Sequence, residues 1–256
     1  MIITELDSTD LSTPTGPMRT YFFRPKAEGR YPGLVLYSEI FQVTGPIRRM
    51  AAMLASHGFV VAVPEIFHEF EPPGRVLVYD EEGAARGNHH KISKTLSGYD
   101  GDARAALDYL TASPHCTGKL GVIGICIGGH LAFRAAMQPD VLAAACFYAT
   151  DIHTCGLGQG QHDNSLDRDN SLDRVGEIRS ELLMIWGRQD PHIPREGRAI
   201  IYNTLSDAGV YFQWHEFNAA HAFMRDEGPR YDPAAAKICY EMTMELFHRR
   251  LGEGGT

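Results

Sequence analysis

Short apolar runs alternate along this chain with stretches in which apolar residues recur every three or four positions. The runs at 33–37, 59–63 and 182–186 are almost continuously apolar, which is typical of strands buried on both faces of a parallel sheet. Two further runs are rich in β-branched and aromatic residues. The predicted strands are 21–24, 33–37, 59–63, 120–124, 144–148, 182–186 and 210–217.

Amphipathic segments lie between these strands and predict helices at 47–54, 131–137 and 195–205. Gly58 follows the first of them as the residue that ends a helix, and Asp102 is expected to cap a helix with alanines and leucines on its inner face. Strands that alternate with helices predict an α/β fold with a doubly wound, mostly parallel sheet and helices on both faces.

The last helix has the clearest start signal. Asp232 and Pro233 have the residue types of an N-cap and a first helical position. The spacing that follows predicts that Ile238, Met242 and Leu246 face the core.

Two polar stretches, 69–94 and 155–175, interrupt the alternation and are expected to be surface loops or cap segments of a single domain spanning 1–256. The second contains a short tandem repeat, at 164–168 and 170–174. Two copies of five residues are too few for a repeat architecture.

The composition excludes several classes of protein. With 24 basic and 32 acidic residues, the net charge is −8, which argues against a nucleic-acid or anionic-membrane partner. No apolar run approaches the roughly 20 residues of a membrane span, and the N-terminus lacks a basic segment followed by an apolar one. The five cysteines include no CxxC pair, so free thiols in a cytoplasmic protein are expected.

The sharpest chemical signal is the segment Gly121-Val-Ile-Gly-Ile-Cys126-Ile-Gly-Gly-His130. A strand ends, a Gly-x-Cys-x-Gly core follows, and a helix begins at once, as in the nucleophile elbow of α/β-hydrolases. The turn is so tight that the residues two positions from the nucleophile, Gly124 and Gly128, must lack side chains. The alternative is a buried cysteine at a glycine-mediated strand–helix contact.

An acid and a base follow the cysteine in the order of a catalytic triad. Asp190 comes directly after the strand at 182–186, and His221 directly after the strand at 210–217. Because the carboxyl ends of parallel strands share one edge of the sheet, Cys126, Asp190 and His221 are expected to meet there. Taken singly, Asp190 before Pro191 is an ordinary turn residue, and His192 is a rival base.

These motifs together resemble the dienelactone hydrolase family of α/β-hydrolases. The resemblance rests on Gly124-Ile-Cys126-Ile-Gly128-Gly129, on Gly187-Arg-Gln-Asp190-Pro-His-Ile-Pro194, on His221-Ala-Phe, and on Glu39-Ile-Phe, and it runs from about 21 to 251. It implies hydrolysis of a lactone or related ester by a Cys–His–Asp triad, through a thioester and without a cofactor.

The resemblance also implies the roles of individual residues. Glu39 corresponds to a glutamate that contacts the catalytic thiol, and the amides of Ile40 and Ile127 correspond to oxyanion donors. Arg225 corresponds to an arginine that holds a substrate carboxylate. Arg86 is the candidate for a second such arginine, although its segment does not align clearly. Glu39 could instead be a solvated loop acid, and Arg225 an exposed loop cation.

One departure from the family pattern is Gln42, where the family has glycine after Glu-Ile-Phe. A carboxylate beside a thiolate raises the pKa of the thiol, so our hypothesis is that Glu39 keeps the resting thiol protonated until substrate arrives.

No metal site is predicted. The chain has twelve histidines, but the pairs at 68–69, 89–90 and 162–163 lack zinc-ligand spacing and are expected to be solvated loop residues. The expected partner is a small ester or lactone, which can be anionic, for a monomer or small homo-oligomer. The alternatives are a general carboxylesterase or thioesterase with the same triad, or a non-catalytic relative that binds a ligand or senses oxidants.

Overall fold

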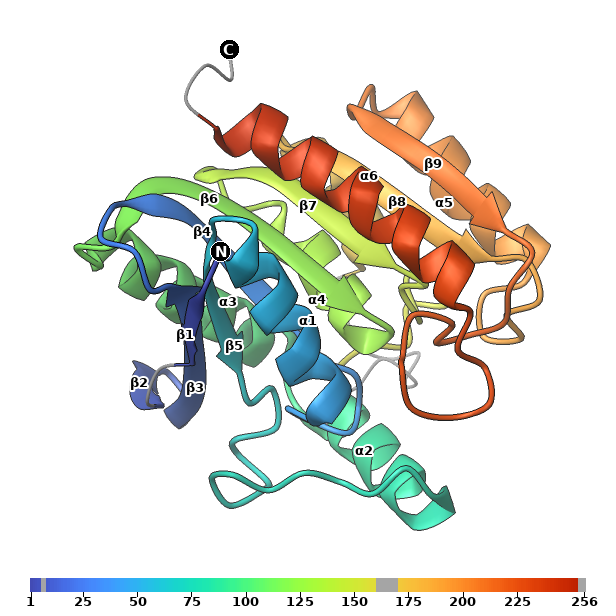
Figure 1. The fold of residues 1–256 in the computed structure, drawn as a ribbon. Coiled ribbons are helices and arrows are strands. Elements are labelled where there is room, and N and C mark those ends of the chain that lie inside the picture. Colours follow the sequence, from blue (N-terminus) through green and yellow to red (C-terminus); the bar gives the residue numbers. More distant parts are fainter. Residues whose placement is uncertain (6–7, 160–169, 253–256) are drawn as a thin grey trace.

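The computed structural model describes residues 1–5, 8–159 and 170–252. Within these residues one sheet has the order β1-β3-β5-β4-β6-β7-β8-β9, with β2 paired to β3 (Figure 1). The strands are β1 (Ile3–Glu5), β2 (Thr9–Thr13), β3 (Gly16–Pro25), β4 (Tyr31–Tyr37), β5 (Val60–Pro64), β6 (Cys116–Ile125), β7 (Val141–Phe147), β8 (Glu181–Gly187) and β9 (Phe212–Phe217). The helices are α1 (Gly45–Ser56), α2 (Glu81–Ser93), α3 (Leu96–Ala112), α4 (Ile127–Ala135), η1 (Ser171–Glu177), α5 (Arg195–Asp207) and α6 (Pro233–Leu251).

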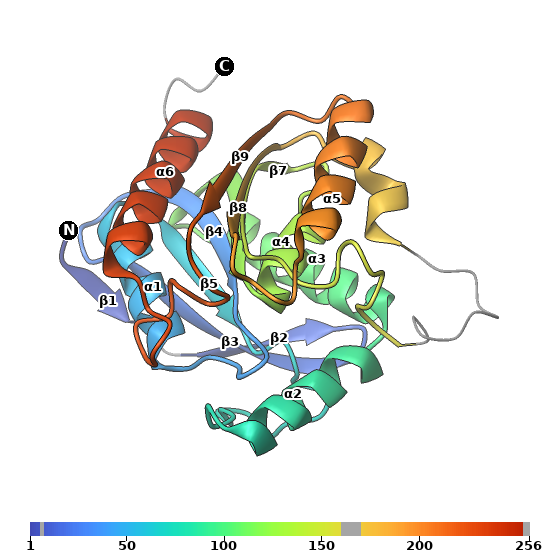
Figure 2. The ribbon, with the colours of Figure 1, turned by 90° about the vertical axis from the view of Figure 1, so that its right-hand side faces the viewer.

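The strands from β5 through β4, β6, β7 and β8 to β9 run parallel. Helices α1 and α6 cover one face of this parallel region, and α3, α4 and α5 cover the other (Figure 2). Every predicted strand overlaps an observed one, and the predicted α/β architecture is confirmed. The reason is that β4 and β5 are buried along nearly their whole length, so their apolar runs carry a clear signal.

The N-terminal edge of the sheet is antiparallel and was only partly predicted. The strand expected at 21–24 is the end of the longer β3, which pairs antiparallel with β1, β2 and β5. β2 buries only Leu11, so its sequence carries almost no apolar alternation.

The expectation that Asp102 caps a helix is wrong. Helix α3 begins at Leu96, and the Thr95 side chain accepts from the amide of Gly98 as its N-cap. Asp102 lies inside the helix and is buried, where it accepts from Lys94 Nζ at 2.5 Å. A buried ammonium satisfies this carboxylate, so it takes no part in capping.

The stretch at 69–94 contains a helix in addition to loop. Asp80 caps α2 by accepting from the amide of Gly83, and two glutamates occupy the first turn. Helix α2 lies outside the helix layers that flank the sheet (Figures 1 and 2). It therefore serves as part of a wall or cap and contributes little to the main core.

The stretch at 155–175 is described only in part. The first copy of the repeat, 164–168, lies outside the described residues, whereas Asn170 in the second copy caps η1 by accepting from the amide of Leu172.

Helix α6 begins as predicted, because Asp232 accepts from the amides of Ala234 and Ala235. The prediction of which residues of α6 face the core is wrong at one position. Ile238 is 43% exposed, and the neighbouring Cys239 is buried in its stead. No helix in the described ranges has the length and hydropathy needed to cross a bilayer.

Candidate active site

The carboxyl ends of β4, β6, β7, β8 and β9 surround a cavity of about 230 Å³. Residues from all five strand ends line it, and α2 forms a further wall. The lining residues are Glu39, Ile40, Phe41, Ala84, Asn88, Lys91, Cys126, Thr150, Asp151, His192, His221, Ala222, Arg225 and Arg230.

Cys126 occupies the tight turn between β6 and α4, with φ 58° and ψ −124°. This left-handed backbone is strained for any residue other than glycine. A Cβ on Gly124 would lie 1.9 Å from the carbonyl oxygen of Gly128, and one on Gly128 would lie 2.3 Å from that of Tyr37. Glycine is therefore required at both positions, as the sequence predicts. In this turn the Cys126 side chain lines the cavity.

The structure brings Asp190 and His221 together behind this thiol. His221 Nδ1 donates to Asp190 Oδ2 at 2.6 Å, and both residues are buried. Burial alone would lower the pKa of the imidazole. The charge of Cys126 and the hydrogen bonds with Asp190 and Cys126 outweigh burial and raise the pKa of His221 from 6.5 to about 10. The Asp190 carboxylate thus stabilises the imidazolium form of His221.

Two neighbours fix the plane of the His221 ring. The Tyr148 ring meets it edge-on with centroids 5.1 Å apart, and His192 does so at 4.7 Å. Asp190 also accepts from the backbone amide of His192 at 2.8 Å. Burial and the charge of His221 lower the pKa of His192, so this rival base lines the cavity as a neutral ring. It is His221 that bonds the acid through its side chain.

The amide of Ile40 follows β4 in a loop that lines the cavity, and the amide of Ile127 is at the first position of α4, directly after Cys126. In the described parts of the chain, neither amide donates to another protein group. An unused donor at a helix N-terminus favours negative charge. These two amides have the chemistry of an oxyanion site.

Glu39 is 2% exposed and lines the same cavity. Its Oε2 accepts from the Tyr79 hydroxyl at 3.2 Å and lies 3.8 Å from Arg225 NH1, so its polar partners are these two groups and not the thiol. Burial raises the pKa of Glu39, while Arg225, His221 and Tyr79 oppose that rise. The carboxyl is buried and paired, which differs from a solvated loop acid.

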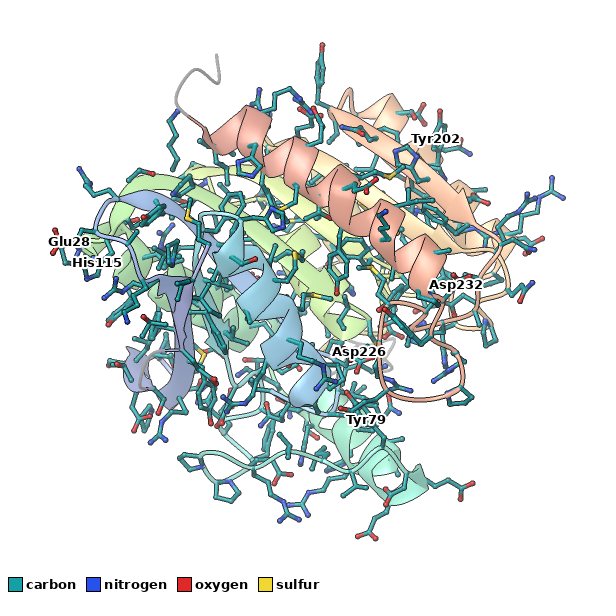
Figure 3. The ribbon with its side chains drawn as sticks, viewed as in Figure 1. Glu28, Tyr79, His115, Tyr202, Asp226 and Asp232 are labelled. Carbon is teal, nitrogen blue, oxygen red and sulfur yellow. The ribbon has the colours of Figure 1, made fainter. Side chains whose placement is uncertain are left out.

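Arg225 is buried and stacks on Tyr79, with its guanidinium carbon 4.2 Å from the ring centroid. Its Nε donates to the carbonyl of Glu227 at 3.0 Å. Figure 3 shows Tyr79 and Asp226 at the edge where the α2 segment meets the loop before α6. Arg225 is thus a held cation at the cavity, and not an exposed loop residue.

Arg86 does not line the cavity. It lies on the outer side of α2, where its NH2 donates to Glu71 Oε2 at 2.9 Å. The further cations that the cavity does contain are Lys91 and Arg230. Lys91 Nζ donates to Asp151 Oδ2 at 2.8 Å, which places an ion pair in the cavity wall.

Sequence reasoning missed Tyr79, Lys91, Asp151 and Arg230 as residues of the site. Asp151 follows a predicted strand end, which is a usable signal. The N-cap at Asp80 marks the start of α2, and a helix starting there places Lys91 on the same face as Ala84, seven residues earlier. Lys91 could have been found in this way. Nothing in the sequence marks Tyr79.

One acidic cluster outside the cavity has ligand-like geometry. His68, Glu69 and Asp102 have ligand atoms within 4.8 Å of one another. The Lys94 ammonium lies among them, 2.8 Å from Glu69 Oε1 and 3.2 Å from His68 Nε2. The cluster already surrounds a cation, so it does not fit a metal ion.

The prediction of solvated loop histidines is right about the exposure of His89, which however lies in α2, and wrong for two others. His68 is paired with Asp102, and the buried His90 donates to Glu71 Oε1 at 2.6 Å. In both cases a buried carboxylate satisfies the ring nitrogen. The pair at 162–163 lies outside the described residues.

Known proteins resemble this chain along nearly its whole length. The model of the dienelactone hydrolase family matches residues 18–251. A Saccharomyces cerevisiae protein, provisionally named a carboxymethylenebutenolidase, is 44% identical over 98% of this chain and 93% of its own length. A carboxymethylenebutenolidase from a Pseudomonas species is 27% identical, with 87% of each chain covered.

Solved structures show the same fold. A Klebsiella pneumoniae protein, provisionally named a dienelactone hydrolase, superposes with a TM-score of 0.82 at 21% identity, covering 97% of this chain and all of that one. The family match over nearly the whole chain, together with the close yeast relative, decides membership. The chain belongs to the dienelactone hydrolase family and is a carboxylic-ester hydrolase with the α/β-hydrolase fold.

Proposed function

We propose that this enzyme opens a lactone or a small carboxylic ester through a triad of Cys126, His221 and Asp190. One observation carries the proposal: the thiol of Cys126, on a strained backbone turn, is paired with the imidazole of His221. The Nδ1 of that imidazole is held by the buried Asp190 carboxylate at 2.6 Å. The names of the yeast and Pseudomonas relatives support a lactone as substrate.

In the first half of the reaction, the Cys126 thiolate attacks the ester carbonyl and a carbon–sulfur bond forms. The charge moves to the carbonyl oxygen, which the Ile40 and Ile127 amides stabilise. The tetrahedral species collapses, the carbon–oxygen bond breaks, and the His221 imidazolium gives its proton to the leaving oxygen. The acyl group remains on sulfur as a thioester.

In the second half, the now neutral His221 takes a proton from water, and the hydroxide attacks the thioester. The carbon–sulfur bond breaks, which releases the acid and restores the thiolate–imidazolium pair. Asp190 stabilises the imidazolium in both halves and keeps the ring in the tautomer with a proton on Nδ1.

The test compares wild type with Cys126→Ala and a matched control, Cys155→Ala. We expect Cys126→Ala to lose at least 1,000-fold in kcat on a lactone and on a chromogenic acetate ester, with unchanged circular dichroism. Cys155→Ala should retain wild-type kcat. Turnover of Cys126→Ala within tenfold of wild type would exclude the triad, and iodoacetamide labelling of Cys126 without any turnover would favour the redox-sensing alternative.

We also propose that Arg225 recognises a carboxylate on the substrate. Its guanidinium is buried, stacked on Tyr79 and faces the buried Glu39 carboxyl at 3.8 Å. Since a guanidinium binds a carboxylate through a bidentate fork, an incoming anion can replace Glu39 as its partner. Glu39 would then lose its counter-charge and become easier to protonate.

Arg225→Met tests this recognition. We expect kcat/KM to fall about 100-fold for an anionic lactone and less than fivefold for a neutral ester of similar size. Arg188→Met is the control, because Arg188 is 66% exposed and does not line the cavity. An equal fall for both substrates would mean that Arg225 acts only on the shape of the cavity.

Location and assembly remain part of the proposal. A cytoplasmic enzyme is supported by Cys116, Cys126, Cys146 and Cys239, which are buried and form no disulfide in the described part of the chain. The net charge of −8 supports a protein that binds neither nucleic acid nor an anionic membrane. A monomer or small homo-oligomer can be distinguished by sedimentation.

A further inference from the structure

Helix α2 presents two different faces to the rest of the molecule. Ala84, Asn88 and Lys91 line the cavity along one stripe. A second stripe, made of Gly83, Gly87 and His90, is buried against the segments on which the helix packs. The helix therefore both lines the cavity and packs against the neighbouring segments.

The buried stripe brings the α2 backbone against the loop that carries an oxyanion donor. A Cβ on Gly87 would lie 2.4 Å from the carbonyl oxygen of Ile40 and 2.9 Å from its Cβ. Because real atoms do not approach so closely, any side chain at 87 must displace Ile40 or the helix. Glycine is a poorer helix former than alanine, so helix formation does not account for this residue.

Three further contacts hold α2 in this position. Lys91 donates to Asp151 across the cavity wall at 2.8 Å, and in the buried stripe His90 donates to the buried Glu71 at 2.6 Å. The amide of Leu77, before the helix, donates to the carbonyl of Phe41 at 3.1 Å, which ties the preceding segment to the same loop. The helix is thus anchored at its cavity side, along its buried stripe and near its start.

We propose that α2 acts as a clamp on the loop of Ile40, and that Gly87 is a positioning residue for the Ile40 amide. An oxyanion donor accelerates the reaction only if its N–H is already aimed at the charge that develops. Ile40 is a loop residue, and the contact with Gly87 limits where its backbone can lie. This inference rests on the proposed function, since it concerns the oxyanion step of ester hydrolysis.

Gly87→Ala tests the clamp. We expect kcat on a chromogenic acetate ester to fall at least 10-fold, and at most by the 100- to 1,000-fold that complete loss of one oxyanion donor costs. Alkylation of Cys126 by iodoacetamide should stay within twofold of wild type, because displacement of iodide creates no oxyanion. Gly176→Ala is the control, since nothing lies within 4 Å of a Cβ at that position.

Glu71→Ala gives a second, independent variant that adds no atoms near Ile40. It removes the buried carboxylate that accepts from His90 and Arg86 of α2, and we expect a fall of about threefold or more in kcat with unchanged alkylation. This variant carries the test if Gly87→Ala does not fold.

The outcomes separate the clamp from the proposed function. Absence of wild-type turnover would overturn the proposed function itself. Turnover by wild type together with near-wild-type kcat in folded Gly87→Ala, or in Glu71→Ala if the first variant does not fold, would overturn the clamp. A parallel fall in kcat and in alkylation would also overturn it, because general disruption of the site would then explain both.

Discussion

The two sides of the cavity are held in place by different forces. On the sheet side, the backbone contacts of Gly124 and Gly128 fix the thiol, and a 2.6 Å hydrogen bond joins His221 to Asp190. On the α2 side, ion pairs add to the packing of Gly87 on Ile40, among them that of Lys91 with Asp151. The reacting atoms thus depend on chain geometry, whereas the wall depends on charges, which respond to pH and substitution.

The largest effect of breaking the sheet side is expected for Asp190→Asn. The amide cannot stabilise the His221 imidazolium, so kcat should fall about 100- to 10,000-fold, or roughly 3–5 kcal/mol in barrier, with little change in melting temperature. Steady-state kinetics on an acetate ester across pH 5–9 measures the loss. Asp108→Asn, at an exposed position on α3, is the control. A loss below tenfold would mean that His221 needs no orienting acid.

The corresponding change on the α2 side is Lys94→Met, just after the helix. It leaves the Asp102 carboxylate buried without its ammonium partner, so the free energy of unfolding should fall by about 3 kcal/mol. Lys94 does not line the cavity, and kcat of the folded enzyme should fall no more than a few-fold.

Urea denaturation and kinetics on the same preparation check this contrast. The control is Lys237→Met, whose side chain is 79% exposed and whose removal should cost less than 0.5 kcal/mol. A kcat that collapses while stability is retained would show that the two sides are not separable in this way.

Glu39 lies where the two sides meet, and its replacement should give the smallest effect on stability. The reason is that its carboxylate keeps Tyr79 and Arg225 as favourable partners. Its pKa is raised in the folded chain above the ordinary 4.5, so the folded state binds the proton more tightly. Stability therefore falls as the pH rises from about 4.5 through the folded-state pKa. Glu39→Gln should lack this decline, and unfolding titrations from pH 4 to 8 compare the two slopes. Parallel slopes would contradict the raised pKa.

The sheet side was largely predictable from the sequence, because close backbone packing leaves a record in residue type. Glycine is required at 124 and 128 because a Cβ there would lie 1.9 and 2.3 Å from a backbone carbonyl oxygen. The ends of β8 and β9 bring Asp190 and His221 to the same edge of the sheet. Gln42 shows the limit of that record. It has φ 70°, where glycine is usual, and its side chain accepts from the amide of Phe67 at 3.2 Å.

The α2 side was much less predictable. The helix has no apolar periodicity, so its cap at Asp80 was its main local signal. Arg86 resembled a substrate ligand by position, but a buried carboxylate, Glu71, holds it on the outer side. Partners of this kind are set by tertiary contacts between segments that are distant in sequence, and the pattern around Arg86 contains no trace of Glu71's burial.

The order of the three proposed triad residues along the chain has a consequence for biosynthesis. Cys126 precedes His221 by 95 residues, and β8 and β9, whose ends bear Asp190 and His221, complete the sheet last. At translation rates of about 5–20 residues per second, the ribosome extends the chain for roughly 5–20 s between the two residues. Throughout that interval the nascent polypeptide lacks His221, so the proposed triad stays incomplete until the final third of the chain has been made and has docked.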